Sequence, residues 1–293
     1  MPETKKEDKK DKEKDILSVA RKQILDQRQT AVKRIIENAD AKNKKDTGEW
    51  LYTGVEGLDE LFEKGIPKGA SILICGGPGS GKTIFCLQTL AWAASKGEKC
   101  LYMTFEEHPD RLKSHLRDFG WDPDELERNG TLKIERFSPF DVTRQVEAML
   151  EQARGELLID VKPMIFPPGF VPDRVAVDSL SAIASAFVGK EETYRIYIEQ
   201  LFRIFEDVGA TSFLISESTD VAKRLTVSGV EEFLADGVIV LYAIRHGTVR
   251  SNAIEILKLR GAGFQKRVVA MQIVPGKGIA VYPEQEMFAE IEY

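Results

Sequence analysis

The chain has 293 residues, of which 43% are hydrophobic, and its formal net charge is −6. This length suits one large α/β domain, or one domain with an appendage. No apolar run approaches the ~20 residues that a membrane helix needs, and the charged start lacks a signal-peptide pattern, so we expect a cytoplasmic protein. The three cysteines indicate buried thiols rather than a disulfide framework or a zinc site. The acidic balance argues against a general nucleic-acid binder, although it does not exclude a local basic groove.

Residues 1–46 differ from the rest, and we expect them to form a charged N-terminal extension before a domain at 47–293. Residues 1–14 alternate lysine with acidic residues, which predicts disorder. Between 15 and 41, apolar residues recur on one side at helical spacing, which predicts a helix. That helix either packs on its own domain or forms an arm that binds a protein partner.

Apolar strand patterns alternate with helical patterns through the middle of the chain. Strands are predicted at 71–75, 100–105, 131–137, 174–178, 211–216 and 237–242, and helices at 84–94, 111–119, 142–154 and 194–208. This alternation predicts an α/β fold with a mostly parallel central sheet and helices on both faces. Short strands at 251–259, 267–274 and 278–281 predict a C-terminal antiparallel extension. Before the first strand, Thr53 is expected to cap a short helix that ends at Gly65 and Pro67.

The pattern Gly76-x-x-x-x-Gly81-Lys82-Thr83 follows a predicted strand and opens a predicted helix, which is the context that a P-loop requires. Glycines let the backbone turn tightly, so that consecutive N–H groups point at phosphate oxygens beside the positive end of a helix dipole. Lys82 is expected to reach the β- and γ-phosphates, and the Thr83 hydroxyl to ligate Mg²⁺. The sequence therefore predicts a nucleoside triphosphate site made by Gly77, Pro78, Gly79, Ser80, Gly81, Lys82, Thr83 and Ile84.

Carboxylates end two further predicted strands. Asp178 follows an apolar strand about a hundred residues after the P-loop, which is the Walker B pattern, and we expect it to hold Mg²⁺ next to Thr83. Glu106 and Glu107 lie where a parallel strand would face the ligand crevice. We interpret this pair as the group that activates the attacking water, the alternative being an acidic pair favoured by a helix N-terminus.

Three other segments leave alternatives open. Residues 216–219 either sense the γ-phosphate or cap a helix. Lys258 and Arg260 alternate on a strand, which suits an anion clamp but also a surface-charged edge strand. The four prolines of 157–172 exclude a helix. This segment is either a loop folded onto its own surface or a contact surface for a neighbouring subunit or partner.

Together, seven motifs resemble those of the KaiC-like ATPases of the RecA superfamily, over about residues 52–282. The motifs are Thr53-Gly-Val-x-Gly-Leu-Asp59, 65–69, 76–83, 104–107, 177–179, 229–237 and 255–261. The chain is similar to the first, ATPase-type domain of the two-domain clock proteins of this family, present once. The features of the second, autophosphorylating domain are missing, so a clock role does not follow.

This resemblance implies a RecA-like P-loop core that binds ATP and Mg²⁺ and hydrolyses ATP, in a regulatory or signalling role. It assigns the triphosphate and magnesium to Lys82, Thr83 and Asp178, and catalysis to Glu106 and Glu107. It further implies that Lys258 and Arg260 reach the γ-phosphate of a neighbouring subunit. The nucleotide would then lie at the subunit interfaces of a homohexamer.

Two other functions compete with this one. A DNA-acting relative of the archaeal recombinases would share the core, with Lys223 and Arg224 of loop 220–227 facing a central channel. The acidic balance and the absence of a helix–hairpin–helix-like domain before the core argue against it. The third is a scaffold that binds ATP with negligible turnover. A protein partner, where there is one, is expected to contact 1–46 or 157–172.

Overall fold

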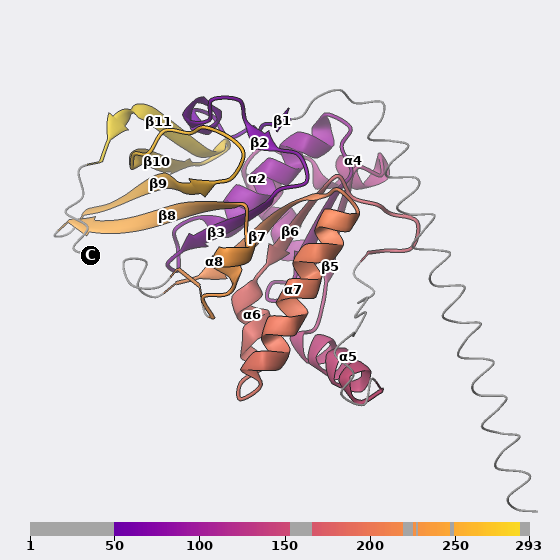
Figure 1. The fold of residues 1–293 in the computed structure, drawn as a ribbon. Coiled ribbons are helices and arrows are strands. Elements are labelled where there is room, and N and C mark those ends of the chain that lie inside the picture. Colours follow the sequence, from indigo (N-terminus) through magenta and orange to yellow (C-terminus); the bar gives the residue numbers. More distant parts are fainter. Residues whose placement is uncertain (1–49, 153–165, 219–224, 227, 247–248, 288–293) are drawn as a thin grey trace, which may run out of the picture. The chain divides into compact units, whose positions relative to one another are not determined.

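The computed structural model describes residues 50–152, 166–218, 225–226, 228–246 and 249–287 (Figure 1). The N-terminal extension and most of the proline-rich segment therefore lie outside the described residues, and the expected boundary at 46 stays a prediction. The described part opens with β1 (Trp50–Leu51), which pairs antiparallel with β2 (Ile66–Pro67). A short 3-10 helix, η1 (Leu58–Leu61), lies between these two strands in the sequence.

The main sheet has nine strands among the described residues, in the order β11-β10-β9-β8-β3-β7-β6-β4-β5. Its parallel part consists of β3 (Ser71–Gly76), β4 (Cys100–Thr104), β5 (Leu132–Arg136), β6 (Arg174–Asp178), β7 (Thr211–Glu217) and β8 (Gly237–His246). Antiparallel pairing adds β9 (Val249–Leu259), β10 (Val269–Val274) and β11 (Gly278–Glu286). The predicted mostly parallel sheet with an antiparallel C-terminal extension is confirmed.

Helices cover both faces of the parallel part (Figure 1). One face packs against α2 (Lys82–Ser95), α3 (Pro109–Asp118) and α4 (Pro123–Arg128). The other face packs against α5 (Pro139–Gln152), α6 (Leu180–Ser185), α7 (Glu191–Asp207) and α8 (Glu231–Leu234). The two sets of contacts make two separate apolar cores.

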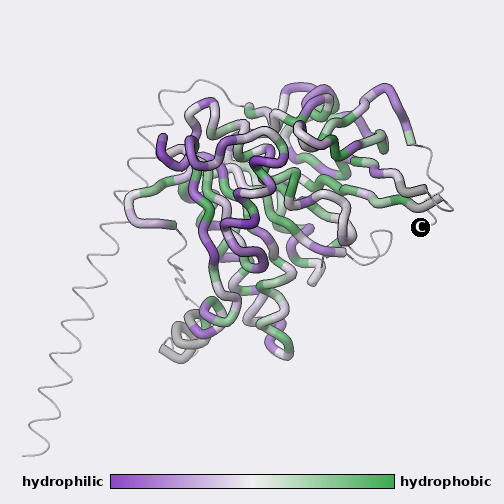
Figure 2. The backbone as a smooth tube through the Cα atoms, turned by 180° about the vertical axis from the view of Figure 1, so that it is seen from behind, coloured by the Kyte–Doolittle hydropathy of each residue, from purple (hydrophilic) through white to green (hydrophobic). Residues whose placement is uncertain are grey.

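Strand β3 illustrates how one sequence serves both cores. Its side chains alternate between faces, so Ile72 and Ile74 lie in the core on the α2 side while Leu73 and Cys75 lie in the core on the α7 side. All six residues of this strand are buried. Figure 2 shows hydrophobic stretches, in green, running through the middle of the described part. A continuous apolar run is therefore the signature of a central strand covered on both faces.

Several elements differ from their predicted form. Helices α4, α6 and α8 have only six, six and four residues, too few for a periodic pattern to indicate them. The prediction for Thr53 was wrong, because η1 begins after Gly57, whose φ of 76° makes a left-handed turn. Thr53 instead donates both its N–H and its hydroxyl to Asp59 Oδ1, each at 2.8 Å. The motif at 53–59 is thus a closed turn held by one carboxylate.

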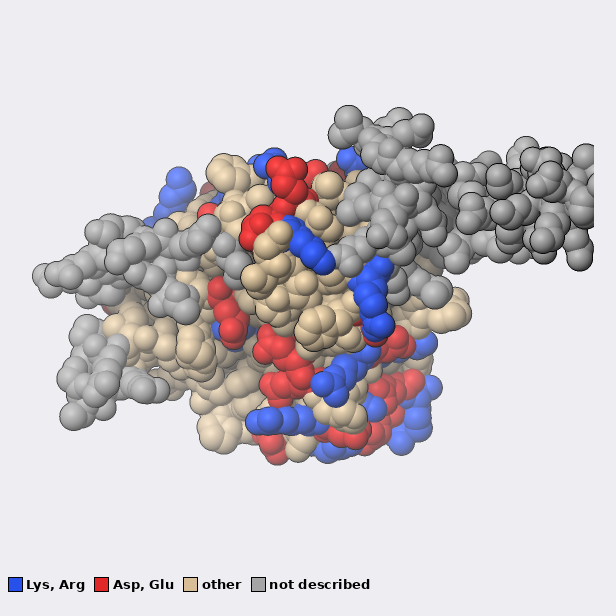
Figure 3. Space-filling view, turned by 90° about the horizontal axis from the view of Figure 1, so that it is seen from below, with Lys and Arg blue, Asp and Glu red and all other residues tan. Residues whose placement is uncertain are grey.

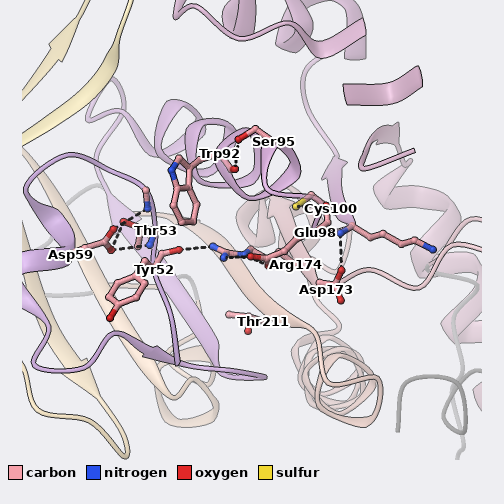
Figure 4. Close-up of polar contacts among 12 residues, drawn as sticks. Tyr52, Thr53, Asp59, Trp92, Ser95, Glu98, Cys100, Asp173, Arg174 and Thr211 are labelled. Carbon is pink, nitrogen blue, oxygen red and sulfur yellow. Dashed lines mark hydrogen bonds and ion pairs between the residues drawn. The ribbon is translucent and has the colours of Figure 1, made fainter. Parts of the chain in front are cut away.

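A buried arginine joins this turn to the sheet, as Figure 4 shows. Arg174 begins β6, and its side chain is 1% exposed. Its Nε and Nη2 donate to the two carboxylate oxygens of Glu98, each at 2.7 Å, and its Nη1 donates to the carbonyl oxygen of Tyr52 at 2.7 Å. The guanidinium carbon lies 5.7 Å from the centre of the Trp92 ring. A charge buried this deeply needs such complete pairing.

On the face seen in Figure 3, the acidic and basic side chains of the described residues are interspersed. None of the helices in the described part combines the length and the apolar character needed to cross a membrane.

Candidate active site

The sheet order brings four motifs together at the carboxyl ends of the parallel strands. Strands β3, β7, β6 and β4 are consecutive neighbours, they run parallel, and their carboxyl ends therefore meet. The residues at or just after these ends are the P-loop, the 216–218 segment, the Asp178–Ser179 pair and the Glu106–Glu107 pair. Ligands of open α/β sheets bind at this kind of edge.

The backbone of the P-loop lies close to a neighbouring strand and turns tightly, as its glycines predict. A Cβ at Gly76 would lie 2.4 Å from the carbonyl oxygen of Leu241, so no side chain fits there. Gly79 and Gly81 adopt φ of 75° and 102°, a region that favours glycine. A Cβ at Gly79 would meet nothing within 4 Å, so this part of the loop lies open. Helix α2 then begins at Lys82.

The groups at the loop suit a phosphate chain. Lys82, 6% exposed, donates from Nζ to the carbonyl oxygens of Gly76 at 3.0 Å and Gly77 at 2.9 Å. The Ser80 hydroxyl is buried and has no hydrogen-bond partner within the part of the chain that the structure describes. A fixed ammonium group, an unpaired buried hydroxyl and the positive end of α2 all favour a polyanion. The loop residues therefore fit the predicted triphosphate.

Two hydroxyl groups meet one carboxylate oxygen beside the loop. Asp178 Oδ2 accepts from Thr83 Oγ1 at 2.9 Å and from the Tyr102 hydroxyl at 2.6 Å. Burial raises the pKa of the Asp178 carboxyl above its usual value, and these hydrogen bonds partly oppose that shift. Hydroxyl and carboxylate oxygens are hard ligands of the kind that Mg²⁺ prefers, with phosphates completing the set. Thr83 and Asp178 therefore fit the predicted magnesium ion.

Glu106 is tied to the Walker B strand. The Ser179 hydroxyl donates to Glu106 Oε1 at 2.5 Å. Ser179 follows Asp178 through a cis peptide bond and is fully buried. Its Oγ also accepts the N–H of Ala182 at 3.1 Å, as the N-cap of α6. The exposed Glu106 carboxylate is thereby fixed close to Asp178, a predicted magnesium ligand.

Glu107 is placed differently from its neighbour. Its Oε2 lies 3.1 Å from Arg111 Nε and 3.6 Å from His115 Nε2, both on α3. The contact with Arg111 is a charge contact rather than an aligned hydrogen bond, because Oε2 has no hydrogen-bond partner among the described residues. The structure thus directs Glu107 toward α3 and Glu106 toward β6, although the sequence presents them as equivalent.

Lys258 and Arg260 lie near the amino-terminal ends of the parallel strands, opposite to the carboxyl ends where the P-loop lies. Lys258 Nζ donates to the carbonyl oxygens of Glu232 and Ala235, at 2.9 and 2.6 Å. Burial and the nearby charge of Arg260 lower the pKa of Lys258. The register sets Leu259 opposite Gly237, and Gly237 opposite Ile72 near the start of β3. Both cations are thus separated from the P-loop of their own chain by most of β3, ~13 Å for four residues.

The 216–219 segment is brought to the site only in part. Glu217 Oε1 lies 3.8 Å from Lys82 Nζ, and the Glu217 N–H donates to Ser181 Oγ at 2.8 Å. Thr219 falls outside the described residues, as do Lys223 and Arg224 of the loop considered for DNA.

Sequence reasoning missed Tyr102 altogether and gave Ser179 no role. Tyr102 lies inside an apolar strand, and none of the motifs marks its position. The available signal is chemical, because the hydroxyl of a buried tyrosine usually needs a partner.

The fold and the site define a class of protein. A P-loop after β3, a Walker B aspartate at the end of β6 and an antiparallel extension beyond β8 make this a RecA-type P-loop nucleotide-binding domain. The sequence profile of the KaiC ATPase family matches residues 51–286. The chain therefore belongs to the KaiC ATPase family.

Relatives include both double-length and single-length proteins. The circadian clock protein KaiC3 of Synechocystis is 33% identical over 80% of this chain and 46% of its own length. The chain thus spans about half the length of the KaiC proteins that it matches. A UPF0273 protein of Aeropyrum pernix is 33% identical over 80% of this chain and 94% of its own. The crystal structure of a KaiC-like protein from Pyrococcus horikoshii has a TM-score of 0.65 and 29% identity, covering 80% of this chain and 99% of that one.

Proposed function

We propose that this protein is a Mg²⁺-dependent ATPase whose nucleotide lies between the subunits of a homohexameric ring, in a regulatory role. The observation that carries the proposal is the meeting of Lys82, Thr83 and Asp178 at one sheet edge. Membership of the KaiC ATPase family supports the choice of ATP. Magnesium, the ring and the regulatory role are the parts of this proposal that need testing.

Each residue has a proposed part in hydrolysis. Lys82 binds the β- and γ-phosphates, while Thr83 and Asp178 hold the metal. Magnesium, when bound, offsets the negative charge of the phosphates. Glu106 accepts a proton from the water that attacks the γ-phosphorus, and the bond from this phosphorus to the β,γ-bridging oxygen breaks to leave ADP and phosphate. Glu107 shares this role in the family's pattern, but its contacts to α3 favour Glu106 as the base.

The position of Lys258 and Arg260 supports a site between subunits. These cations lie at the edge opposite their own P-loop, so they can meet a γ-phosphate only in another copy. Arg260 Nη2 donates to the carbonyl oxygen of Phe233 at 3.0 Å, which links it to α8. The Phe233 side chain is 79% exposed beside it. An exposed aromatic residue next to a charged group suits a buried contact between subunits.

The mass in solution tests the ring. Light scattering on a sizing column would be measured without nucleotide, with ADP and with a non-hydrolysable ATP analogue. We expect a hexamer that the ATP analogue stabilises and that Arg260→Ala weakens. Arg267→Ala is the matched control, because it removes an arginine paired with Glu286 in the antiparallel extension. A monomer under all conditions would remove the ring and the trans role of Arg260.

Phosphate release tests hydrolysis separately. Turnover that requires Mg²⁺ and is lost in Lys82→Ala supports the ATPase. Tight binding of Mg·ATP without turnover would instead favour the scaffold. The comparisons do not favour the DNA-acting alternative. Contacts of a protein partner with 1–46 or 157–172, and the cytoplasmic location, stay predictions.

A further inference from the structure

We propose that Tyr102 is a positioning residue for the magnesium site, holding one oxygen of the Asp178 carboxylate and leaving the other for the metal. The inference rests on the proposed function, because it concerns the same magnesium ion. It adds a residue outside the P-loop and Walker B motifs. The contact that carries it is the 2.6 Å hydrogen bond from the Tyr102 hydroxyl to Asp178 Oδ2.

The fold leaves Tyr102 little freedom. It lies at the centre of β4, opposite Ala176 of β6, and its side chain is 0% exposed. Its ring packs in the core on the α2 side, among residues such as Phe85 and Cys86. A tyrosine has only two side-chain torsions, and a close-packed core fixes both. The hydroxyl is thus a rigid donor. It reaches Asp178, which comes two residues after the strand partner of Tyr102, Ala176.

The second donor on the same oxygen is of a different kind. Thr83 also donates to Asp178 Oδ2, but the Thr83 hydroxyl is itself a proposed metal ligand. Its orientation therefore depends on whether the metal is bound, while that of Tyr102 does not. With both donors on Oδ2, the carboxylate cannot rotate without losing two hydrogen bonds. Groups that orient a ligand in this way typically change metal affinity 10–100-fold when removed.

The test substitutes Tyr102→Phe, which removes one atom and keeps the ring. The matched control is Tyr194→Phe, since the Tyr194 hydroxyl donates at the same 2.6 Å to Glu231, also in a buried setting but on α7. Loss of one such hydrogen bond is small compared with the stability of a typical folded domain, so both variants should fold. Thermal melting without nucleotide checks this.

The readout is binding of a fluorescent ADP, titrated with Mg²⁺ and repeated in EDTA. We expect Tyr102→Phe to weaken the apparent Mg²⁺ affinity about tenfold or more, with unchanged binding of ADP in EDTA. Tyr194→Phe should melt at a similarly lowered temperature but titrate like the wild type.

Three results would overturn the inference. A Mg²⁺ titration of Tyr102→Phe that superimposes on the wild type, or is tighter, removes the positioning role and leaves the proposed function standing. An equal loss of Mg²⁺ affinity in Tyr194→Phe would assign the effect to general destabilisation. A wild-type protein that binds ADP without any Mg²⁺ dependence would overturn both the inference and the magnesium part of the proposed function.

Discussion

The Ser179 hydroxyl connects the start of α6 to Glu106, because it accepts the Ala182 N–H while donating to Glu106 Oε1 at 2.5 Å. Ser179→Ala should therefore have two separable effects. Loss of the N-cap should lower the free energy of unfolding by about 1 kcal/mol. Loss of the hydrogen bond should also reduce turnover, because the Glu106 carboxylate is no longer held in place by Ser179.

Asp122→Ala is the control for the first effect, because Asp122 caps α4 away from the site by accepting the Glu125 N–H at 3.0 Å. It should lower stability similarly without changing turnover. Ser179→Thr keeps the hydroxyl and should retain turnover. If Ser179→Ala and Asp122→Ala have the same turnover, Ser179 has a structural role alone.

The two glutamates should behave differently. We expect Glu106→Gln to reduce the rate of phosphate release about 100-fold or more while Mg·ATP still binds, which is the usual weight of a general base. Glu107→Gln should cost less activity, because Glu107 contacts Arg111 and His115 of α3. Single-turnover phosphate release and a separate binding titration check this. A greater loss in Glu107→Gln would transfer the role of base to that residue.

A mixing experiment can show whether Arg260 acts on another copy. Glu106→Gln and Arg260→Ala should each be nearly inactive alone. In an equimolar mixture, roughly one quarter of the interfaces would combine an intact Glu106 with an intact Arg260 from the neighbour, given a ring of like contacts. Activity should then recover in the mixture. Absence of recovery, with mixed oligomers seen by mass, would assign Arg260 to its own chain or to assembly alone.

Thiol chemistry should report unfolding. Cys75, Cys86 and Cys100 are all buried. Burial raises the pKa of the Cys75 thiol to about 12 and also raises that of Cys86. A thiol reagent should therefore react with the native protein only as fast as it opens, and Mg·ATP should slow the reaction. Rapid reaction of a folded sample with any of these three cysteines would contradict the packing.

The raised pKa of the Cys75 thiol also makes the stability of the fold depend on pH. At low pH the thiols are protonated in both states, and their contribution to stability is fully present. As the pH rises above the ordinary value of 9.0 toward about 12, the unfolded state ionises first, so stability falls through this window. Urea unfolding at a series of pH values measures this fall, and Cys75→Ala should make it smaller.

Buried Arg174 should contribute more to the free energy of unfolding than an exposed arginine. Arg174→Leu should lower the free energy of unfolding by about 2–4 kcal/mol, because the carbonyl oxygen of Tyr52 and the half-exposed Glu98 lose their donors. Arg117→Ala removes an equally short pair with Asp124 on the surface, and it should change stability little. Chemical denaturation of both variants checks this. If both substitutions lower the free energy of unfolding equally, burial does not explain the contribution of Arg174.

The fold was largely predictable because its central strands are continuous apolar runs. The 174–178 strand was predicted with its observed limits, and the P-loop helix differs from its prediction by two residues at the start and one at the end. Short elements could not be predicted in this way. Helix α8 has four residues, and its position depends on carbonyl contacts with Lys258, which follows it by more than twenty residues.

The site was predictable where motif and position coincide. Lys82, Thr83 and Asp178 are recognised by spacing, and the structure brings Thr83 and Asp178 into contact. Tyr102 could not be recognised, because its role depends on the pairing of β4 with β6. The difference between Glu106 and Glu107 likewise depends on which neighbour each adjacent side chain meets, and spacing along the chain does not contain that information.

The opposite placement of Arg260 and the P-loop on one sheet determines the symmetry that its contacts can have. If each copy offers a cation at one edge and a phosphate site at the other, the two partner surfaces are different patches. Such a contact is heterologous and runs head to tail, so two copies related by a two-fold axis cannot satisfy both edges at once. An open chain of copies always has one unpaired cation surface at one end and one unpaired phosphate site at the other. Both are occupied only if the copies close into a ring. If the rotation between neighbours does not close, the same contact produces a helical filament.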